Sequence, residues 1–165
     1  MNLISQLDFK IQKSYLFATV TQGKAFEMVF DLKPQSVSTV QTNIIHLANT
    51  SDYSMEAGGR LPALWFSKGG TQLKIVTTKT KSKNLDYSGT SLPLNVYSNI
   101  KVVQHRNLAD DYIFSLYVNG TEVFNGVIEA AQEWSNTKVY IGSPWSEPAD
   151  AYMKNFVMRN LRDEG

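Results

Sequence analysis

The sequence contains no cysteine and only two histidines among its 165 residues. Without cysteine the chain can form no disulfide, no thiolate nucleophile and no cysteine-ligated zinc site. It also has no apolar run near the ~20 residues that a membrane-spanning helix requires. The net charge of +1 provides no overall field to attract nucleic acid or a membrane. We therefore expect neither a nucleic-acid partner nor insertion into a membrane.

Sequence motifs of familiar enzymes are missing as well. The chain has no Gly-x-Ser-x-Gly elbow, no phosphate-binding loop, no His-Glu-x-x-His helix and no EF-hand loop. His46 and His105 are single residues in predicted strands, where an isolated histidine usually has a structural role. We expect a protein that is not an enzyme, although catalytic residues that are distant in sequence would escape this test.

Alternation of apolar and polar residues with a period of two is the dominant pattern of the sequence, and it predicts β-strands. In residues 25–33 the side chains of Phe26, Met28, Phe30 and Leu32 share one face. Similar patterns predict strands over residues 61–68, 73–77, 100–106, 112–118, 121–124, 137–141 and 151–158. Asn119-Gly120 between two of these strands is the strongest short hairpin signal, and Gly69-Gly70 predicts another tight turn.

Helix-favouring composition occurs only in residues 127–134, a segment too short to form a stable isolated helix. It could equally be a strand edge or one helical turn on a loop. Many short strands with turn signals between them are typical of a sandwich or barrel. The sequence therefore predicts one all-β domain over residues 1–165, an antiparallel β-sandwich.

The second half of the chain carries four motifs in order: residues 99–103 (NIKVV), 112–120 (YIFSLYVNG), 137–145 (TKVYIGSPW) and 148–156 (PADAYMKNF). A long strand ending in Val-Asn-Gly, a late strand ending in a glycine-containing loop and this final strand resemble the laminin G-like and pentraxin-like branch of the concanavalin A-like jelly rolls. Residues 25–32, 44–47 and 64–66 are similar to earlier strands of that family. The resemblance spans about residues 15–160.

This resemblance implies a jelly roll that acts outside the cell or on its surface and binds glycans or proteins, in some members with calcium. Residues 1–5 lack the basic region and apolar core of a secretory signal, so we expect the sequence to begin after such a signal. Two departures from the family are clear. The disulfide that many laminin G-like domains carry is impossible here, and the Glu-x-Asp-x-x-Glu string of related glycosidases is absent.

Acidic residues in predicted loops are the candidates for binding calcium, which prefers several oxygen ligands. The family topology makes Asp52 and Asp150 the preferred pair, with Glu56, Asp86, Asp110, Asp111 and Glu147 as further candidates. The alternative is that these loop carboxylates cap turns and remain solvated.

Basic and aromatic side chains are the candidates for binding a ligand directly. Lys79, Lys81 and Lys83 would project to one side of an extended segment and could bind an acidic glycan, or they could protect a strand edge from aggregation. Tyr53, Tyr87 and Trp145 lie in predicted loops, where a sugar could stack on an aromatic ring. Alternatively, Trp145 closes the end of the core.

The leading hypothesis is an extracellular binding module that recognises a glycan or a protein partner through rim loops at residues 49–60, 79–90 and 143–150. The second is a structural domain that assembles with copies of itself, for which a large exposed apolar patch would be evidence. The third is a glycan-active enzyme with an unusual carboxylate pair.

Overall fold

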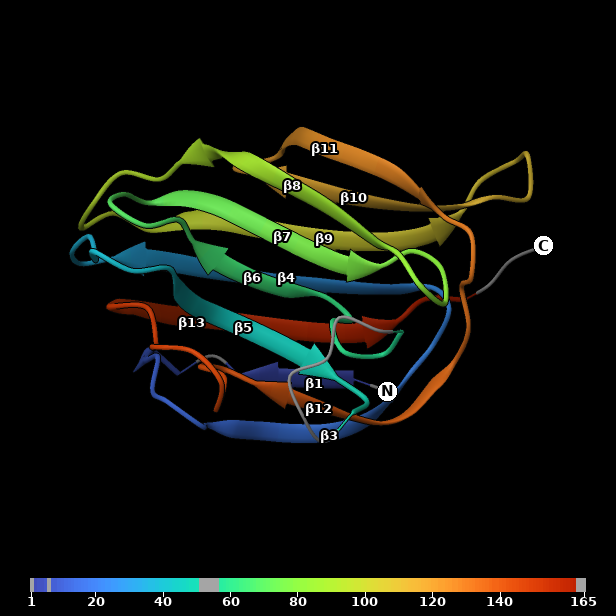
Figure 1. Cartoon of the computed structure of the whole chain (residues 1–165), viewed down its shortest axis with the longest axis horizontal. Coiled ribbons are helices and arrows are strands. Elements are labelled where there is room, and N and C mark those ends of the chain that lie inside the picture. The colour runs from blue at the N-terminus through green and yellow to red at the C-terminus, as the bar shows by residue number, and fades with distance from the viewer. Residues whose placement is uncertain (1, 6, 51–56, 163–165) are drawn as a thin grey trace.

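Thirteen β-strands form two facing antiparallel sheets in the computed structural model, which describes residues 2–5, 7–50 and 57–162 (Figure 1). The strands are β1 (Asn2–Ser5), β2 (Phe9–Lys10), β3 (Leu16–Gln22), β4 (Phe26–Pro34), β5 (Thr42–Ala48), β6 (Ala63–Phe66), β7 (Gln72–Thr78), β8 (Asn84–Ser91), β9 (Ser98–Arg106), β10 (Tyr112–Val118), β11 (Thr121–Ile128), β12 (Trp134–Tyr140) and β13 (Ala151–Asn160). One sheet has the order β1-β13-β4-β9-β10-β11, with β2 also paired to β13, and the other has the order β3-β12-β5-β6-β7-β8. Among the described residues there is no helix that could cross a membrane. The predicted all-β sandwich is confirmed.

The core lies between the two sheets, where the alternating side chains of the strands meet. The predicted inward face of β4 is confirmed, because Met28, Phe30 and Leu32 are fully buried. In β5 every residue is buried, including those on the outer face of its sheet. A second, smaller cluster of Ala63, Trp65 and Val76 lies on that outer face. Burial of the apolar face of each sheet against the other is what stabilises the sandwich.

The hairpin between β10 and β11 has the geometry that Asn-Gly predicts. Asn119 and Gly120 have φ angles of 50° and 81°, as a type I′ turn requires. The β6–β7 connection is longer than a two-residue turn. It runs from Ser67 to Thr71, with Gly69 at a φ of 78° and a bond from the Gly70 N–H to the Ser67 carbonyl.

One alternative left open by the sequence is decided, and one local prediction was wrong. Residues 127–134 are strand ends and a crossing rather than a helical turn: they complete β11, cross to the other sheet and begin β12. The predicted rim loop at 79–90 is a loop only up to residue 83, because residues 84–91 form β8. Glycine, asparagine and serine give β8 the composition of a loop, but pairing along the whole of β7 overrides that local preference.

The antiparallel order of the strands gathers the connecting loops at the two ends of the sandwich. We call one of them the Asp150 end, formed by residues 11–15, 35–41, 67–71, 92–97 and 141–150. Backbone bonds join these loops: Gln35 N–H to Asp150 O, Gly69 N–H to Ser38 O and Asn95 N–H to Pro34 O. At the other end, which we call the Lys79 end, Glu129 N–H donates to Lys79 O. Figure 1 shows the Asp150 end on the left and the Lys79 end on the right.

Candidate functional site

Asp150, a predicted metal ligand, holds together three separate segments at the Asp150 end. Its Oδ2 accepts a hydrogen bond of 2.6 Å from the Ser36 hydroxyl. Its Oδ1 lies 3.2 Å from the Lys10 ammonium. The Ser36 bond first, and then Lys10, lower the pKa of the Asp150 carboxyl below its usual value, against the opposing effect of partial burial. Asp150 is therefore ionised at neutral pH and is already paired.

A polar hollow of about 430 Å³ opens beside Asp150. Hydroxyl groups and carboxylates supply most of its polar lining, and valines, a proline and a phenylalanine supply the apolar part. The lining residues are Ser36, Val37, Ser38, Thr39, Val40, Thr42, Phe66, Gly70, Glu147, Pro148 and Asp150. Hydroxyls and carboxylates can exchange several hydrogen bonds with a ligand that is itself rich in hydroxyl groups.

A second hollow of about 190 Å³ adjoins the Lys10–Asp150 ion pair, since Lys10 lines this hollow and Asp150 lines the first. Phe9, Lys10, Gln12 and Tyr15 line it. Tyr15 is 44% exposed, more than any other described tyrosine, tryptophan or phenylalanine. The ring of Tyr15 packs against the ring of Phe9, with 6.2 Å between the ring centres, and this contact supports its position. The two hollows together combine polar groups with one exposed ring at the same end of the sandwich.

Asn43, at the start of β5, fixes the loop that carries Asp150. Its Oδ1 accepts from the Ser143 N–H at 2.9 Å, and its Nδ2 donates to the Leu64 carbonyl at 3.2 Å. Its backbone N–H and C=O bond Glu147 and Ala149. Because Asn43 is fully buried, these bonds have no competition from water.

Replacing Asn43 by alanine is expected to destabilise the protein by about 2 kcal/mol, because buried groups on Ser143 and Leu64 lose their partner. Chemical denaturation measures the change. The exposed Asn125, whose amide bonds only Glu122, provides the control, and its replacement by alanine should alter stability by less than about 0.5 kcal/mol. Equal effects at both positions would contradict the role given to Asn43.

The other predicted ligand-binding residues that the structure describes do not lie together. Trp145 lies in the loop at the Asp150 end as predicted, but it is only partly exposed. Its ring packs against His46 at 5.0 Å and Tyr140 at 5.6 Å on the outer face of the sheet. Asp52, Tyr53 and Glu56 lie outside the described residues, so their roles stay predictions.

The lysine segment lies at the Lys79 end, away from Asp150. It does not form the extended run that would project Lys79, Lys81 and Lys83 to one side. The chain turns back instead, with the Lys79 N–H bonded to the Lys83 carbonyl. Lys79 is also paired with Glu129 at 3.5 Å, while Lys81 and Lys83 are exposed.

Tyr87 is not in a rim loop, as the sequence predicted, but in β8. Its ring stacks on Phe124 of β11 at 5.0 Å, where the two sheets meet at their edges. The alternation of β8 points Leu85 and Tyr87 inward, which explains this position.

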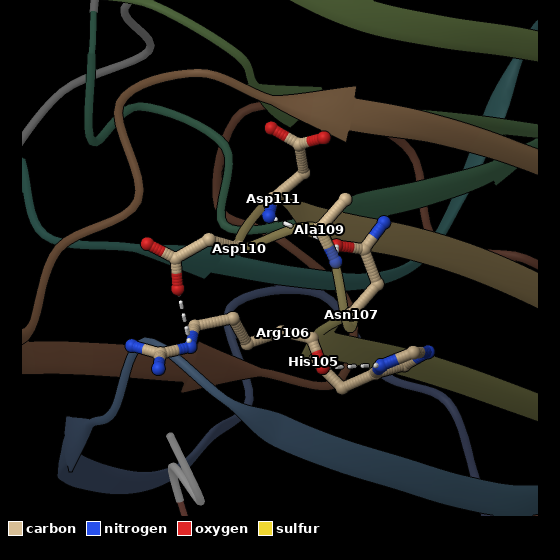
Figure 2. A network of polar contacts seen from close by, with 6 residues as sticks. All are labelled: His105, Arg106, Asn107, Ala109, Asp110 and Asp111. Atoms are coloured by element: carbon tan, nitrogen blue, oxygen red, sulfur yellow. Dashed lines mark hydrogen bonds and ion pairs between the residues drawn. The ribbon is translucent and has the colours of Figure 1, made fainter.

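In the loop of residues 107–111 at the Lys79 end, the Asp110 carboxylate is engaged by Arg106, and Asn107 bonds the backbone of the turn (Figure 2). Arg106 Nε lies 2.9 Å from Asp110 Oδ1. The Asn107 side chain accepts from the N–H groups of Ala109 and Asp111 and so fixes the turn. Across the described ranges, no three or more acidic or histidine side chains gather as a metal site would require.

The described side chains at the Asp150 end bring two of the predicted calcium ligands together. Asp150 and Glu147 share the polar hollow, but each carboxylate is paired with a lysine, Lys10 and Lys13. Calcium binding by Asp52 and Asp150 remains a prediction.

Comparisons with known proteins show which solved structures share this fold. No protein-family model matches the sequence, and no curated protein matches it either. Solved structures do match. The receptor binding domain of botulinum neurotoxin type G has a TM-score of 0.61 at 14% identity, over 98% of this chain and 42% of the neurotoxin chain. The fold is an antiparallel β-sandwich of the jelly-roll type.

Two further structures agree. The heptameric SAP-like pentraxin from Limulus polyphemus has a TM-score of 0.59 at 14% identity, over 98% of this chain and 78% of the pentraxin. Trypanosoma rangeli sialidase has a TM-score of 0.60 at 15% identity, over 84% of this chain and 21% of the sialidase. This chain thus spans less than half the length of the neurotoxin and sialidase chains. At such identities the likeness shows the shared jelly roll, and the site must be argued from this chain's own residues.

Three residues of the candidate site, Lys10, Tyr15 and Ser36, were not singled out from the sequence, because they are far from Asp150 along the chain. The pairing of β2 and β4 with β13 brings Lys10 and Ser36 to the Asp150 end, and the bond from the Tyr15 N–H to the Gly142 carbonyl brings Tyr15 there. One feature of the sequence could have indicated Tyr15 as a binding residue: it is an aromatic residue immediately before a strand, in a segment with Lys13 and Ser14.

Proposed function

We propose that this chain is a non-catalytic binding module, active outside the cell, that binds a glycan at the Asp150 end. The observation that carries the proposal is the union of a polar hollow with an exposed tyrosine across the Lys10–Asp150 ion pair. A sugar presents hydroxyl groups at its edge and C–H groups on its face. The hydroxyls and carboxylates suit the edge, and the ring of Tyr15 suits the face.

The preorganisation of the site supports this function. Asn43 fixes the 143–149 loop, Ser36 and Lys10 orient Asp150, and backbone bonds join the loops to one another. Loops held on a rigid sandwich bind with a smaller entropic cost than loops that must order on binding. The matched neurotoxin domain is described as receptor binding, and one matched sialidase, of which this chain covers 21%, is described as a complex with sialic acid. We extend to this chain only the general role of a binding module, of the laminin G-like or pentraxin-like kind.

The pairing of both carboxylates in the hollow supports binding rather than hydrolysis. A glycosidase needs one carboxyl that is protonated to act as the acid and a second that is ionised. Here Ser36 and Lys10 lower the pKa of Asp150, which does not favour a protonated acid at this position at neutral pH. Glu147 forms an ion pair of 3.6 Å with Lys13.

A glycan array tests the proposal, run with calcium and again with the metal chelated. We expect binding to at least one class of glycan, and its loss on chelation would implicate calcium, with Asp52 and Asp150 the first residues to replace. For the glycan that binds, Tyr15→Ala should weaken affinity about tenfold, because it removes the stacking surface. The double variant Lys81→Ala/Lys83→Ala at the Lys79 end is the matched control and should bind normally.

Two outcomes would overturn the proposal. Binding that the lysine variant abolishes and Tyr15→Ala leaves intact would move the site to the Lys79 end. Release of shortened sugars from the bound glycan, detected by chromatography, would show an enzyme.

A further inference from the structure

Two Asn-x-Ser/Thr triplets, the acceptor pattern for an N-linked sugar chain, occur in the sequence: Asn49-Thr50-Ser51 and Asn119-Gly120-Thr121. Such triplets also arise by chance, so each has to be judged by its place in the fold. An N-linked sugar chain is bulky and belongs on the surface. It needs open space around the amide nitrogen of the asparagine that carries it. The two asparagines differ in what engages that nitrogen.

Asn119 is held through its oxygen and not through its nitrogen. It lies in the β10–β11 turn, where it is exposed together with Gly120 and Thr121. Its Oδ1 accepts a hydrogen bond of 2.8 Å from the Asn99 N–H, and its own N–H donates to the Asn99 carbonyl at 2.8 Å. No described residue bonds its Nδ2. Because the side-chain bond uses Oδ1, an asparagine that bears a sugar on Nδ2 can keep this bond.

The β10–β11 turn has open space around it. A Cβ added at Gly120 would have no atom within 4 Å. β11, which the turn begins, is the last strand of its sheet, so one side of the hairpin is a free edge. An exposed strand edge can pair with another chain, and a bulky group at its tip hinders that pairing. The turn therefore has both the room for a sugar chain and a use for one.

Asn49, in contrast, uses its amide nitrogen to hold the fold together. Its Nδ2 donates to the carbonyl of Ser135 in β12, and its backbone N–H donates to the Gly58 carbonyl at 2.8 Å. The first sugar on this nitrogen would lie against the backbone of β12. Its triplet ends at Ser51, which is outside the described residues.

We propose that Asn119 carries an N-linked sugar chain and that Asn49 does not. The inference rests on the extracellular location proposed above, but not on glycan binding. The donor is an oligosaccharide linked to a polyprenyl diphosphate. The Asn119 Nδ2 forms a bond to the anomeric carbon of the sugar as the bond from that carbon to the diphosphate oxygen breaks. The diphosphate lipid leaves with the electron pair, and a base of the transferase takes one Nδ2 proton.

The attached sugar chain would leave the proposed binding site open. Val118 pairs with Ile100 near the start of β9, so the turn lies at the Asp150 end. The order β13-β4-β9-β10 separates the turn from β13, which follows Asp150, by two intervening strands. Asn119 lines neither of the hollows beside Asp150. A bound glycan and the attached chain therefore occupy separate places.

Secretion from mammalian cells behind an added signal sequence tests the inference, with protein taken from the medium and from the microsomal fraction. We expect the intact mass to show one sugar chain. Its release by a peptide-N-glycosidase in water labelled with heavy oxygen should convert Asn119, and not Asn49, to labelled aspartate. Thr121→Ala should abolish the chain, because it removes the hydroxyl that the transferase requires and leaves the bonds between Asn119 and Asn99 intact. Thr121→Ser is the matched control and should keep the chain.

Two results would overturn the inference: unmodified protein in both fractions, or a sugar chain on Asn49. The readout is the mass of the protein and not its binding, so this failure is distinguishable from failure of the proposed function. A protein that carries the chain at Asn119 but binds no glycan on the array would overturn the binding role alone.

Discussion

Replacement of Gly142 by alanine is expected to destabilise the protein by about 3 kcal/mol or more and to weaken glycan binding. Gly142 follows β12 with a φ of 95°, a conformation that residues with a Cβ rarely adopt. A Cβ there would also collide with the backbone carbonyl of Gln12. Strain at such a φ costs about 1–3 kcal/mol, and displacement of the 11–15 segment adds to it. Denaturation and glycan affinity measure the two effects, which are linked because this segment carries Tyr15.

Gly120 provides the matched control. It has a φ of 81° in the β10–β11 turn, but a Cβ at this position has nothing within 4 Å. Gly120→Ala should therefore cost only the backbone strain, about 1 kcal/mol, and should not affect glycan binding. If the two variants were equally destabilising, the close approach of residues 12 and 142 would not be important for the fold.

Acidification from pH 6.5 to pH 4 is expected to reduce the free energy of unfolding by about 3 kcal/mol through His46 alone. The imidazole is fully buried between Trp65 and Trp145, and its Nε2 lies 2.7 Å from the Gly59 carbonyl. Burial lowers the pKa of His46 from 6.5 to about 4, with a smaller lowering from Arg60, and the Gly59 bond opposes both.

The direction in which stability changes with pH depends on whether the folded or the unfolded state binds the proton at His46. Below pH 6.5 the unfolded chain takes up a proton at His46 while the folded chain does not, so stability falls. The loss is complete near pH 4, where the folded state also binds the proton. Urea denaturation at a series of pH values measures the slope.

His46→Gln provides the comparison for this prediction. The variant has a lower stability at neutral pH, because a buried ring is lost, but it should lack this part of the pH dependence. A difference between the two proteins that is constant from pH 7 to pH 4 would show that His46 is not held neutral by the fold.

The sequence predicted the strands whose environment is uniform along their length. In β4 one face is core and the other is half-exposed, so Phe26, Met28, Phe30 and Leu32 alternate with residues that are polar except for Val29. Asn119-Gly120 is equally readable because the turn conformation is encoded in two adjacent residues. The alternation of side chains and the turn residues were together sufficient to predict the β-sandwich.

Strands at the edges of the sheets were harder to predict. β8 contains Asn84, Ser88 and Gly89, and its strand conformation comes from pairing with β7 rather than from its own preferences. β3 is also an edge strand, and the side chains of Leu16, Thr19 and Thr21 are exposed, which weakens the alternation. A composition-based reading places such segments in loops.

The candidate site was only partly predictable, because it depends on pairing between distant segments. Asp150 and the 143–150 loop could be singled out as acidic and rich in turn residues. Their partners Lys10 and Ser36 could not, since β2 and β4 meet β13 only in the folded sheet. The same limit explains why the sequence directed attention to Lys79, Lys81 and Lys83, which lie together along the chain but at the opposite end of the sandwich from Asp150.

The central claim is that the Asp150 end binds the glycan, and an NMR titration of the ¹⁵N-labelled protein with the glycan found on the array tests it most directly. The account predicts that the amide shifts that change most belong to Lys10, Tyr15, Ser36 and Asp150, with little change at residues 79–83. Changes concentrated at residues 79–83, or on the outer face of the sheet around Lys74, would contradict it.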